Sequence, residues 1–381
     1  MSNAQNDSNL LYPHKTKDDF MLNRPYLLAT LLGGTIFGAM GASAQVVDIE
    51  KGGFKFSISG QINQGILYTD DGEETNSFFV DNDNSSTRAR AKISYDFGKF
   101  LIGGEIEYEF ELSSSAVVNQ SNTHESRSLA NERKFEIFTE GSFGKFSVGQ
   151  GDSASNGASE DDLSGTTVVG YSGIADLAGG ILFRDGSGTL TSTNVGSRFS
   201  NLDGNSRIER VRYDTPNFGG FVVSASVGHD DREDLAVRYG KTYGDIEVRS
   251  AIAYSANDSR ERYHGSISGL HKPSGYSLTF ATGIEDQDTG SRDTSFGYVK
   301  VGYQIDDLLP YGTTAFSIDY YDGQDIGVDG DDSESFGIQV VQKVDRYNSE
   351  VYIGYRNYSY SAPGSTFQDV DAILAGVRFK F

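Results

Sequence analysis

The stretch Arg88-Ala-Arg-Ala-Lys-Ile-Ser-Tyr-Asp-Phe-Gly-Lys-Phe-Leu-Ile-Gly-Gly-Glu-Ile-Glu-Tyr-Glu-Phe-Glu111 alternates polar and apolar residues on both sides of a short glycine-containing turn. Basic residues occupy positions 88, 90 and 92 before the turn, and glutamates occupy every second position from 105 to 111 after it. A period of two that is interrupted by a glycine turn predicts a β-hairpin. Like charges on one strand face, opposite an apolar face, favour a strand whose polar side meets water inside a barrel.

The same alternation recurs along the chain and continues to its last residue. The first clear example pairs the apolar set Phe54, Phe56, Ile58, Ile62, Ile66 and Tyr68 with the polar set Lys55, Ser57, Ser59, Gln61 and Asn63. Several predicted strands reach about ten residues, whereas strands of globular proteins average about five or six. Aromatic pairs such as Phe143/Phe146 flank the turns, as an interfacial girdle would. A membrane barrel is therefore favoured over a soluble β-sandwich.

Connections between the predicted strands alternate between tight turns and long loops. The long loops are acidic and rich in Gly, Asn and Ser, at residues 70–86, 113–130, 285–294 and 322–334. Residues 45–381 (381 − 44 = 337 residues) accommodate about sixteen strands. The predicted fold is all-β: one transmembrane antiparallel β-barrel of about sixteen strands, wide enough for a water-filled lumen.

One connection, residues 151–205, is far longer than the others. It contains the acidic residues Glu160, Asp161 and Asp162 and an apolar stretch that could anchor it. We expect this third long loop to fold into the lumen as a constriction loop. Its carboxylates would face a basic set consisting of Arg88, Arg90, Lys92, Arg210 and Arg212. Opposed charges across a narrow zone create a transverse field that penalises apolar solutes. A loop exposed to solvent outside the barrel is the alternative.

The N-terminal segment has the features of a secretion signal. Arg24 precedes the apolar residues 26–40, and Ala42-Ser43-Ala44 follows them. This order predicts a signal peptide over residues 1–44. The polar residues 1–20 fit no part of such a signal, and Met21 is a second candidate start, so residues 1–20 can lie upstream of the true start.

Composition excludes several classes of function. The formal net charge is −22, and residues 1–44 contribute equal numbers of acidic and basic residues, so the mature chain carries the same charge. Such a charge argues against nucleic-acid binding. The chain has no cysteine, which excludes thiolate metal sites and a cysteine nucleophile. The histidines are scattered and no nucleotide or zinc motif is present, so we expect no catalytic residues and no enzymatic activity.

Two acidic tracts, residues 70–74 and 329–332, offer the oxygen ligands that hard cations prefer. Neither has the spacing of an EF-hand. We therefore expect solvated acidic loops and no cofactor. The alternative is structural Ca²⁺ or Mg²⁺ at these acidic loops, either bridging them to lipopolysaccharide phosphates or bound at the third loop.

Three segments resemble the general porins of Gram-negative bacteria, and the alphaproteobacterial type most. Arg210-Val-Arg-Tyr-Asp-Thr-Pro-Asn-Phe-Gly-Gly-Phe221 is similar to the family's R-Y-D-S/T-P-x-F-x-G-F segment. Residues 143–150 resemble the strand and turn that lead into the family's third loop. The terminal Val377-Arg-Phe-Lys-Phe381 resembles the signal read by the outer-membrane assembly machinery, with Phe381 as its aromatic end. The resemblance implies a homotrimer and an inward-folded third loop.

The sequence therefore predicts a general diffusion porin, multi-pass in the bacterial outer membrane. Small hydrophilic solutes and ions would pass through it passively, with a mild preference for cations. Its other expected contacts are lipopolysaccharide and outer-membrane lipid. Two alternatives stay open: a solute-specific channel on the same barrel, and a surface adhesin or structural barrel.

Overall fold

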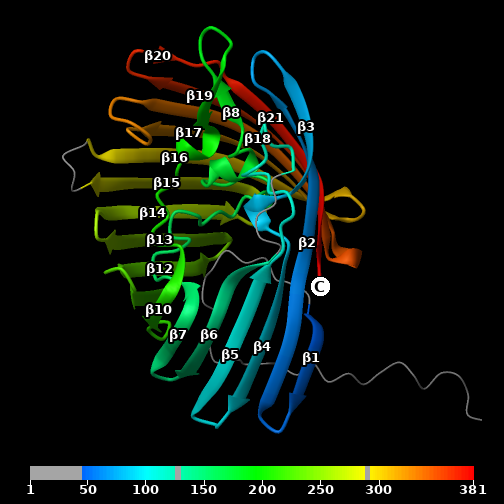
Figure 1. Ribbon diagram of the computed structural model, residues 1–381. Helices are drawn as coiled ribbons and strands as arrows, with labels where there is room; N and C mark the ends of the chain where they lie inside the picture. The colour runs from blue at the N-terminus through cyan, green and yellow to red at the C-terminus, as the bar shows by residue number, and fades with distance from the viewer. Residues whose placement is uncertain (1–44, 125–129, 288–291) are drawn as a thin grey trace, which may run out of the picture. The chain divides into compact units, whose positions relative to one another are not determined.

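The computed structural model describes residues 45–124, 130–287 and 292–381, so the predicted signal peptide, residues 1–44, lies outside the described residues. Sixteen strands form one closed antiparallel barrel (Figure 1). They are β2 (Phe54–Asp70), β4 (Arg88–Asp96), β5 (Phe100–Glu109), β6 (Asn131–Gly141), β7 (Gly144–Asp152), β10 (Arg207–Asp214), β11 (Phe221–Gly228), β12 (Glu233–Tyr243), β13 (Ile246–Asn257), β14 (Arg260–His271), β15 (Tyr276–Gln287), β16 (Thr294–Leu309), β17 (Gly312–Gln324), β18 (Asp332–Val344), β19 (Ser349–Ala362) and β21 (Val370–Lys380). The prediction of an antiparallel barrel of about sixteen strands is confirmed.

Shorter elements extend or decorate this barrel. The strands are β1 (Gln45–Lys51), β3 (Thr75–Asp81), β8 (Leu182–Arg184), β9 (Leu190–Asn194) and β20 (Ser365–Thr366). The short 3-10 helices are η1 (Asp83–Ser85), η2 (Ile174–Leu177), η3 (Val195–Ser197) and η4 (Asp345–Tyr347). Among the described residues, no helix is long and apolar enough to cross a membrane.

The barrel closes at β2, the strand that contacts both ends of the sheet. Its first half pairs with β4, and its second half pairs with β21 on the opposite edge. β1 continues the line of β21 along that edge. At the junction, the backbones of Phe381 and Gly60 exchange two hydrogen bonds of 2.9 and 2.7 Å. The terminal aromatic residue therefore sits at the seam, while its role as an assembly signal stays a prediction.

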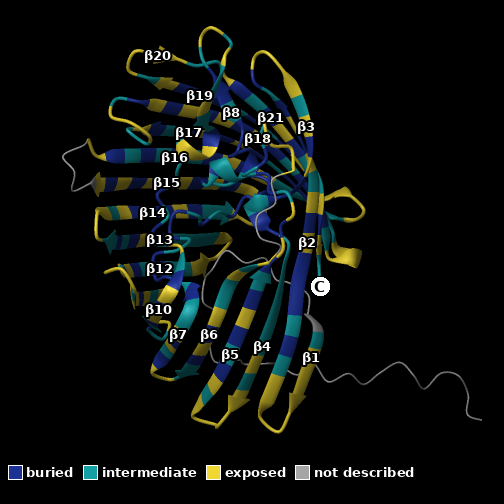
Figure 2. Cartoon of the chain, in the orientation of Figure 1, coloured by how far each residue is buried: buried dark blue, intermediate teal, exposed yellow. Residues whose placement is uncertain are grey.

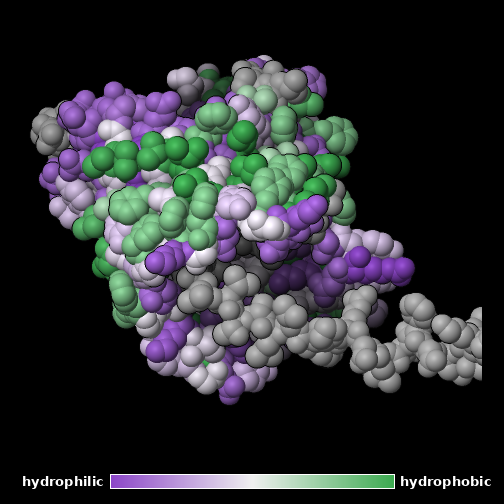
Figure 3. All heavy atoms as spheres, turned by 90° about the horizontal axis from the view of Figure 1, so that it is seen from below, coloured by the Kyte–Doolittle hydropathy of each residue, from purple (hydrophilic) through white to green (hydrophobic). Residues whose placement is uncertain are grey.

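Buried and exposed residues alternate along the strands of the wall, as the sequence pattern predicts (Figure 2). On β13, for example, Ile252 is 67% exposed while its neighbours Ala251 and Ala253 are buried. Apolar side chains point outward on most strands, and Figure 3 shows hydrophobic residues in broad patches on the outer surface. The inner face carries buried Ser, Thr, Arg and Glu residues. Exposed apolar side chains on a closed barrel are suited to lipid hydrocarbon.

The structure differs from the sequence-based expectation mainly in the connections. The predicted loop 70–86 contains β3, which pairs with the second half of β2. The predicted loop 322–334 is shorter, because β17 continues to Gln324 and β18 begins at Asp332. β1 was not expected before Phe54. Acidic and Ser-rich stretches do not exclude strands when the backbone can pair with a neighbouring strand, which explains these differences.

Candidate pore and constriction loop

The inner face of the first strands carries paired charges. Arg90 on β4 donates from Nε to Glu107 on β5 at 2.7 Å, and Arg133 on β6 donates from Nε to the same carboxylate at 2.7 Å. Lys134 reaches Asp152 at 2.8 Å. The alternation of bases on β4 and acids on β5 puts opposite charges directly across the ladder, where Arg90 opposes Glu107. The like charges of each strand are thus compensated by the next strand.

Residues 153–206, here called L3, connect β7 to β10 and pack against the inner face of the wall. Serine hydroxyls of the wall accept from L3 backbone amides: Ser226 from Ala154 at 2.8 Å, Ser266 from Asp161 at 2.9 Å and Ser268 from Leu163 at 2.9 Å. These serines occupy inward positions on β11 and β14. A polar inner face therefore satisfies the backbone groups of a segment that lacks long regular structure of its own.

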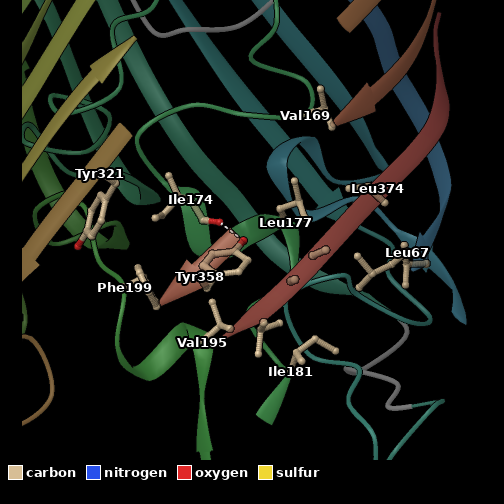
Figure 4. Packing of buried hydrophobic residues seen from close by; sticks show 14 of the residues in the cluster. Leu67, Val169, Ile174, Leu177, Ile181, Val195, Phe199, Tyr321, Tyr358 and Leu374 are labelled. Carbon is tan, nitrogen blue, oxygen red and sulfur yellow. Dashed lines mark hydrogen bonds between the residues drawn. The ribbon is translucent and has the colours of Figure 1, made fainter. Parts of the chain in front are cut away.

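A second set of contacts holds L3 against the later strands. The Lys300 ammonium group on β16 donates to the Asp162 carboxylate at 2.8 Å and to the Gly170 carbonyl oxygen at 2.7 Å. The Lys300 side chain is fully buried. Tyr358 on β19 donates to the Ile174 carbonyl oxygen at 2.7 Å, the dashed line in Figure 4. Polar anchors thus bind L3 at points far apart along the segment.

Apolar side chains fill the space between L3 and strands β16 to β21. Ile174, Leu177, Ile181 and Val195 of L3 belong to one buried cluster with wall residues, among them Leu67, Tyr321, Tyr358 and Leu374 (Figure 4). Burial of each such side chain contributes roughly 1.5–3 kcal/mol. The apolar stretch within residues 151–205 thus packs against the wall formed by β16 to β21 and the second half of β2.

Within L3, the hairpin β8–β9 contacts three neighbouring loops. The Arg184 guanidinium donates to Asp71 of the loop after β2 at 2.9 Å. Gly186 donates to the Thr366 carbonyl oxygen, and Gln368 donates to that of Arg184, both at 2.9 Å. Gln120 of the loop after β5 donates to the Leu182 carbonyl oxygen at 2.8 Å. The pKa of Asp71 lies below its usual value, since its hydrogen bonds, the one from Arg184 above all, outweigh its desolvation.

A cavity of about 1120 Å³ lies between L3 and the rest of the inner wall. Ten acidic residues line it: Asp83, Glu109, Asp152, Glu160, Asp162, Asp176, Asp203, Glu247, Asp345 and Glu350. Ten basic residues line it as well: Arg88, Arg133, Arg207, Arg212, Arg238, Arg249, Arg262, Lys343, Arg378 and Lys380. All ten bases lie on wall strands, whereas four of the acids lie in L3 and a fifth, Asp83, lies in η1 after β3. Loop acids therefore face wall bases across this space.

The structure brings together some of the predicted constriction residues and separates others. Arg88, Arg212, Glu160 and Asp162 line the cavity, and Arg90, Lys92, Asp161 and Arg210 do not. Arg90 is paired with Glu107, and the Arg210 guanidinium with Glu136. The Lys92 ammonium group lies 4.9 Å from the centre of the Phe138 ring. Asp162 is paired with Lys300, a residue outside the predicted basic set. The roles of all eight residues in permeation stay predictions.

Two neighbouring acidic residues of L3, Glu160 and Asp161, have pKa values shifted toward their neutral forms. Burial, and then the nearby carboxylates of Asp203 and Asp176, raise the pKa of Glu160 well above its usual value. Burial also raises the pKa of Asp161 to about 6, against the opposing effect of Arg238 and Arg249. L3 therefore carries less negative charge near neutral pH than its sequence indicates.

Lys300, which anchors L3, and several residues that line the cavity were not singled out from the sequence. Lys300 lies in an ordinary alternating strand, and its partner Asp162 is 138 positions away. Arg133, Arg207 and Arg238 also occupy alternating positions, so the only available signal was a charged residue on an inward strand face. A charged residue on an inward strand face indicates that the residue faces the lumen, but it does not indicate which residues lie at the narrowest part.

Groups of side chains that could bind a metal ion are absent from the part of the chain that the structure describes. There, no group of three or more His, Cys, Asp or Glu side chains is placed to hold a metal ion. In the acidic tract 70–74, Asp71 instead accepts hydrogen bonds from the backbone amides of Glu73 and Glu74 at 3.1 and 2.8 Å. The structural-calcium alternative stays a prediction.

Comparisons with known proteins agree with this architecture. A family model described as Gram-negative porin matches residues 29–363. The fold is similar to an anion-selective porin from Comamonas acidovorans (TM-score 0.61, 14% identity, 86% of this chain and 100% of that chain). It is also similar to the trimer form of OmpT from Vibrio cholerae (0.58, 14%, 87% and 100%) and to Salmonella typhi OmpF in complex with daunomycin (0.55, 14%, 88% and 100%). A comparison with curated proteins found no match.

Proposed function

The chain belongs to the Gram-negative porin family, and on that basis we propose that it is a general diffusion porin with a mild preference for cations. Membership and the closed barrel make it a multi-pass outer-membrane protein and a non-enzymatic diffusion channel. The proposal concerns what passes: small hydrophilic solutes and ions, without a dedicated binding site.

The observation that carries this proposal is the cavity beside L3. It is lined by opposed charges rather than by a set of groups that matches one solute. Acidic and basic groups on opposite sides orient water and disfavour apolar solutes. A small hydrated solute of either charge can interact with groups of the opposite charge. L3 supports the constriction role because it is bound to the inner wall by side chains from β11, β14, β16 and β19.

The preference for cations rests on the loops rather than on the cavity. The cavity has equal numbers of acidic and basic residues, but the chain as a whole carries −22. Acidic residues gather in the loops after β2 and β17, among them Asp71, Glu73, Glu74, Asp325, Asp329 and Asp331. A negative potential at the mouth raises the local concentration of cations before they reach the constriction. The anion-selective porin of similar fold shares too little sequence to oppose this proposal.

We also propose that the assembled form is a homotrimer, as in the trimer form of OmpT. Lipopolysaccharide and outer-membrane lipid would surround the apolar outer wall, and the outer-membrane assembly machinery would recognise the C-terminal Phe381. Chemical crosslinking of the purified protein in detergent, followed by mass measurement, tests the trimer. A monomer at all concentrations would contradict it.

Planar-bilayer recording tests the proposed function. The mature protein would be reconstituted, and its conductance and reversal potential measured across a KCl gradient. The proposal predicts stepwise, largely ohmic openings and a reversal potential on the cation side. Saturable block by one sugar or organic acid would favour a solute-specific channel instead, and an inserted protein that passes no current would favour an adhesin or structural barrel.

A further inference from the structure

Three arginines of the inner wall hold the backbone at the start of L3. Their guanidinium groups donate to carbonyl oxygens between residues 152 and 156. The shortest of these bonds run from Arg210 to Asp152 at 3.0 Å, from Arg212 to Ser153 at 2.7 Å and from Arg238 to Asn156 at 2.6 Å. Arg238 lies on β12, and its second bond reaches the Ala154 carbonyl oxygen at 3.4 Å. All three side chains therefore anchor the same segment of L3.

The three arginines differ in how their charges are compensated. Arg210 forms an ion pair with Glu136, and Arg212 forms one with Asp214. In the part of the chain that the structure describes, no carboxylate oxygen lies within 4.0 Å of the Arg238 guanidinium group. The positive charge of Arg238 is therefore the least compensated of the three.

Anchoring alone does not explain a charge at position 238, because a neutral donor could bind the same carbonyl oxygens without the cost of burying an unpaired cation. Arg238 is only 5% exposed, and it lines the cavity beside L3. One of its terminal nitrogens makes both bonds to L3, and the guanidinium group makes no other hydrogen bond to a described residue. Asp161 and Asp203 of L3 act on its charge only from longer distances. The remaining N–H groups are therefore available to solutes in the cavity.

We propose that Arg238 is a specificity-determining residue of the channel, at which anions passing the constriction meet an uncompensated positive charge. A guanidinium group donates well to carboxylates, so small organic acids gain this contact as well as chloride. Arg210 anchors the same segment but is neutralised by Glu136, so it adds little to the potential in the lumen. The acidic loops favour cations at the mouth, and Arg238 limits that preference inside. The inference rests on the proposed diffusion function and names a residue that tunes its selectivity.

Arg238→Gln removes the charge and keeps an amide that can donate to the same carbonyl oxygens. A unit charge about 10 Å from an ion in water changes the occupancy of that ion by about a factor of two. The permeability ratio of K⁺ to Cl⁻, measured by the reversal potential in planar bilayers, should therefore rise about fourfold. Arg238→Lys keeps the charge and should retain the wild-type ratio.

Arg210→Gln combined with Glu136→Gln is the matched control. It removes an anchor of the same L3 segment without changing the net charge, and Arg210 does not line the cavity. Its permeability ratio should stay at the wild-type value. An equal rise in this control and in Arg238→Gln would overturn the inference, by assigning the effect to a displaced L3.

A cysteine at the same position tests the charge within one folded channel, because the natural chain contains no cysteine. Arg238→Cys would be treated during bilayer recording with a thiol reagent that carries an ammonium group, or with a neutral reagent of similar size. The ammonium reagent should return the ratio to nearly the wild-type value, and the neutral reagent should leave it raised. Equal responses to the two reagents, or no response to the charged one, would overturn the inference.

The failure of this inference differs from the failure of the proposed function. A conducting Arg238→Gln channel with an unchanged ratio would overturn the role of Arg238 and leave the diffusion function standing. An inserted wild-type protein that passes no current would contradict the diffusion function, and the role of Arg238 with it. If Arg238→Gln does not fold, the comparison of the two reagents on Arg238→Cys decides the question.

Discussion

The two sides of the barrel interior use charged residues in different ways. Where L3 and the apolar cluster cover β16 to β21, charges are sealed in: Arg356 and Asp319 are 2.8 Å apart and fully buried. The turn-side ends of β18 and β21, with Lys343 and Arg378, instead line the cavity. Along β4 to β6, Arg88 and Arg133 line an open cavity. The same alternating pattern thus produces a buried ion pair where L3 covers the inner face. Where L3 leaves the inner face open, it produces charged side chains that line the cavity.

The largest expected effect comes from breaking a sealed pair on the filled side. Arg356→Leu leaves the Asp319 carboxylate buried without its cationic partner, so the free energy of unfolding should fall by about 3–5 kcal/mol. Urea unfolding in detergent, followed by tyrosine fluorescence, would measure it. On the open side, Arg90→Leu leaves Glu107 still paired with Arg133, and the expected loss is about 1 kcal/mol. Equal losses would remove the distinction between the two sides.

Lys300→Met tests whether L3 is held in place by its contacts with the filled side. The substitution removes the bonds to Asp162 and Gly170, so we expect a loss of about 3 kcal/mol in stability and a noisier open-channel current. Lys343→Met is the control, because it removes a cavity-lining lysine that makes no such bond to L3. If both variants gave the same quiet current, L3 would not depend on Lys300.

Arg88→Ala should change selectivity with little effect on stability. Arg88 lines the open cavity, and a unit charge about 10 Å from an ion in water changes its energy by about 0.4 kcal/mol, a factor of about two. The change favours K⁺ and disfavours Cl⁻ by about a factor of two each, so the permeability ratio of K⁺ to Cl⁻ should rise about fourfold, as measured by the reversal potential. Arg90→Ala should shift it in the same direction. An unchanged potential would place Arg88 outside the narrow zone.

The last expected effect is a pH dependence from L3. The pKa of Asp161 is raised to about 6, so folded protein binds this proton more tightly than unfolded protein does. Its contribution to stability should therefore increase as pH falls through about 6, and level off near the unfolded value of about 4. Protonation of Asp161 should also reduce cation preference over this range. Asp161→Asn should flatten the stability profile, and an unaltered profile would contradict this assignment.

Much of the wall could be predicted from the sequence, because strand alternation is a local property. The hairpin of residues 88–111 shows both faces within 24 residues, and its charges pair as β4 and β5. The interior of L3 could not be predicted in this way. Lys300 and Asp162, or Tyr358 and Ile174, meet only once the barrel has closed, and nothing near either residue in the sequence marks the pairing. Glu160, Asp162, Arg88 and Arg212 were identified through charge clustering, which marks the lumen but not the partners.

Cysteine accessibility tests the contrast between the two sides most directly, because the natural chain contains no cysteine. Arg88→Cys on the open side and Ala372→Cys, buried in the apolar cluster of the filled side, would be exposed to a charged, water-soluble thiol reagent during bilayer recording. The account predicts a rapid change of current for Arg88→Cys and none for Ala372→Cys. Rapid modification of Ala372→Cys, with Arg88→Cys inert, would contradict it and place the water path on the side that L3 covers.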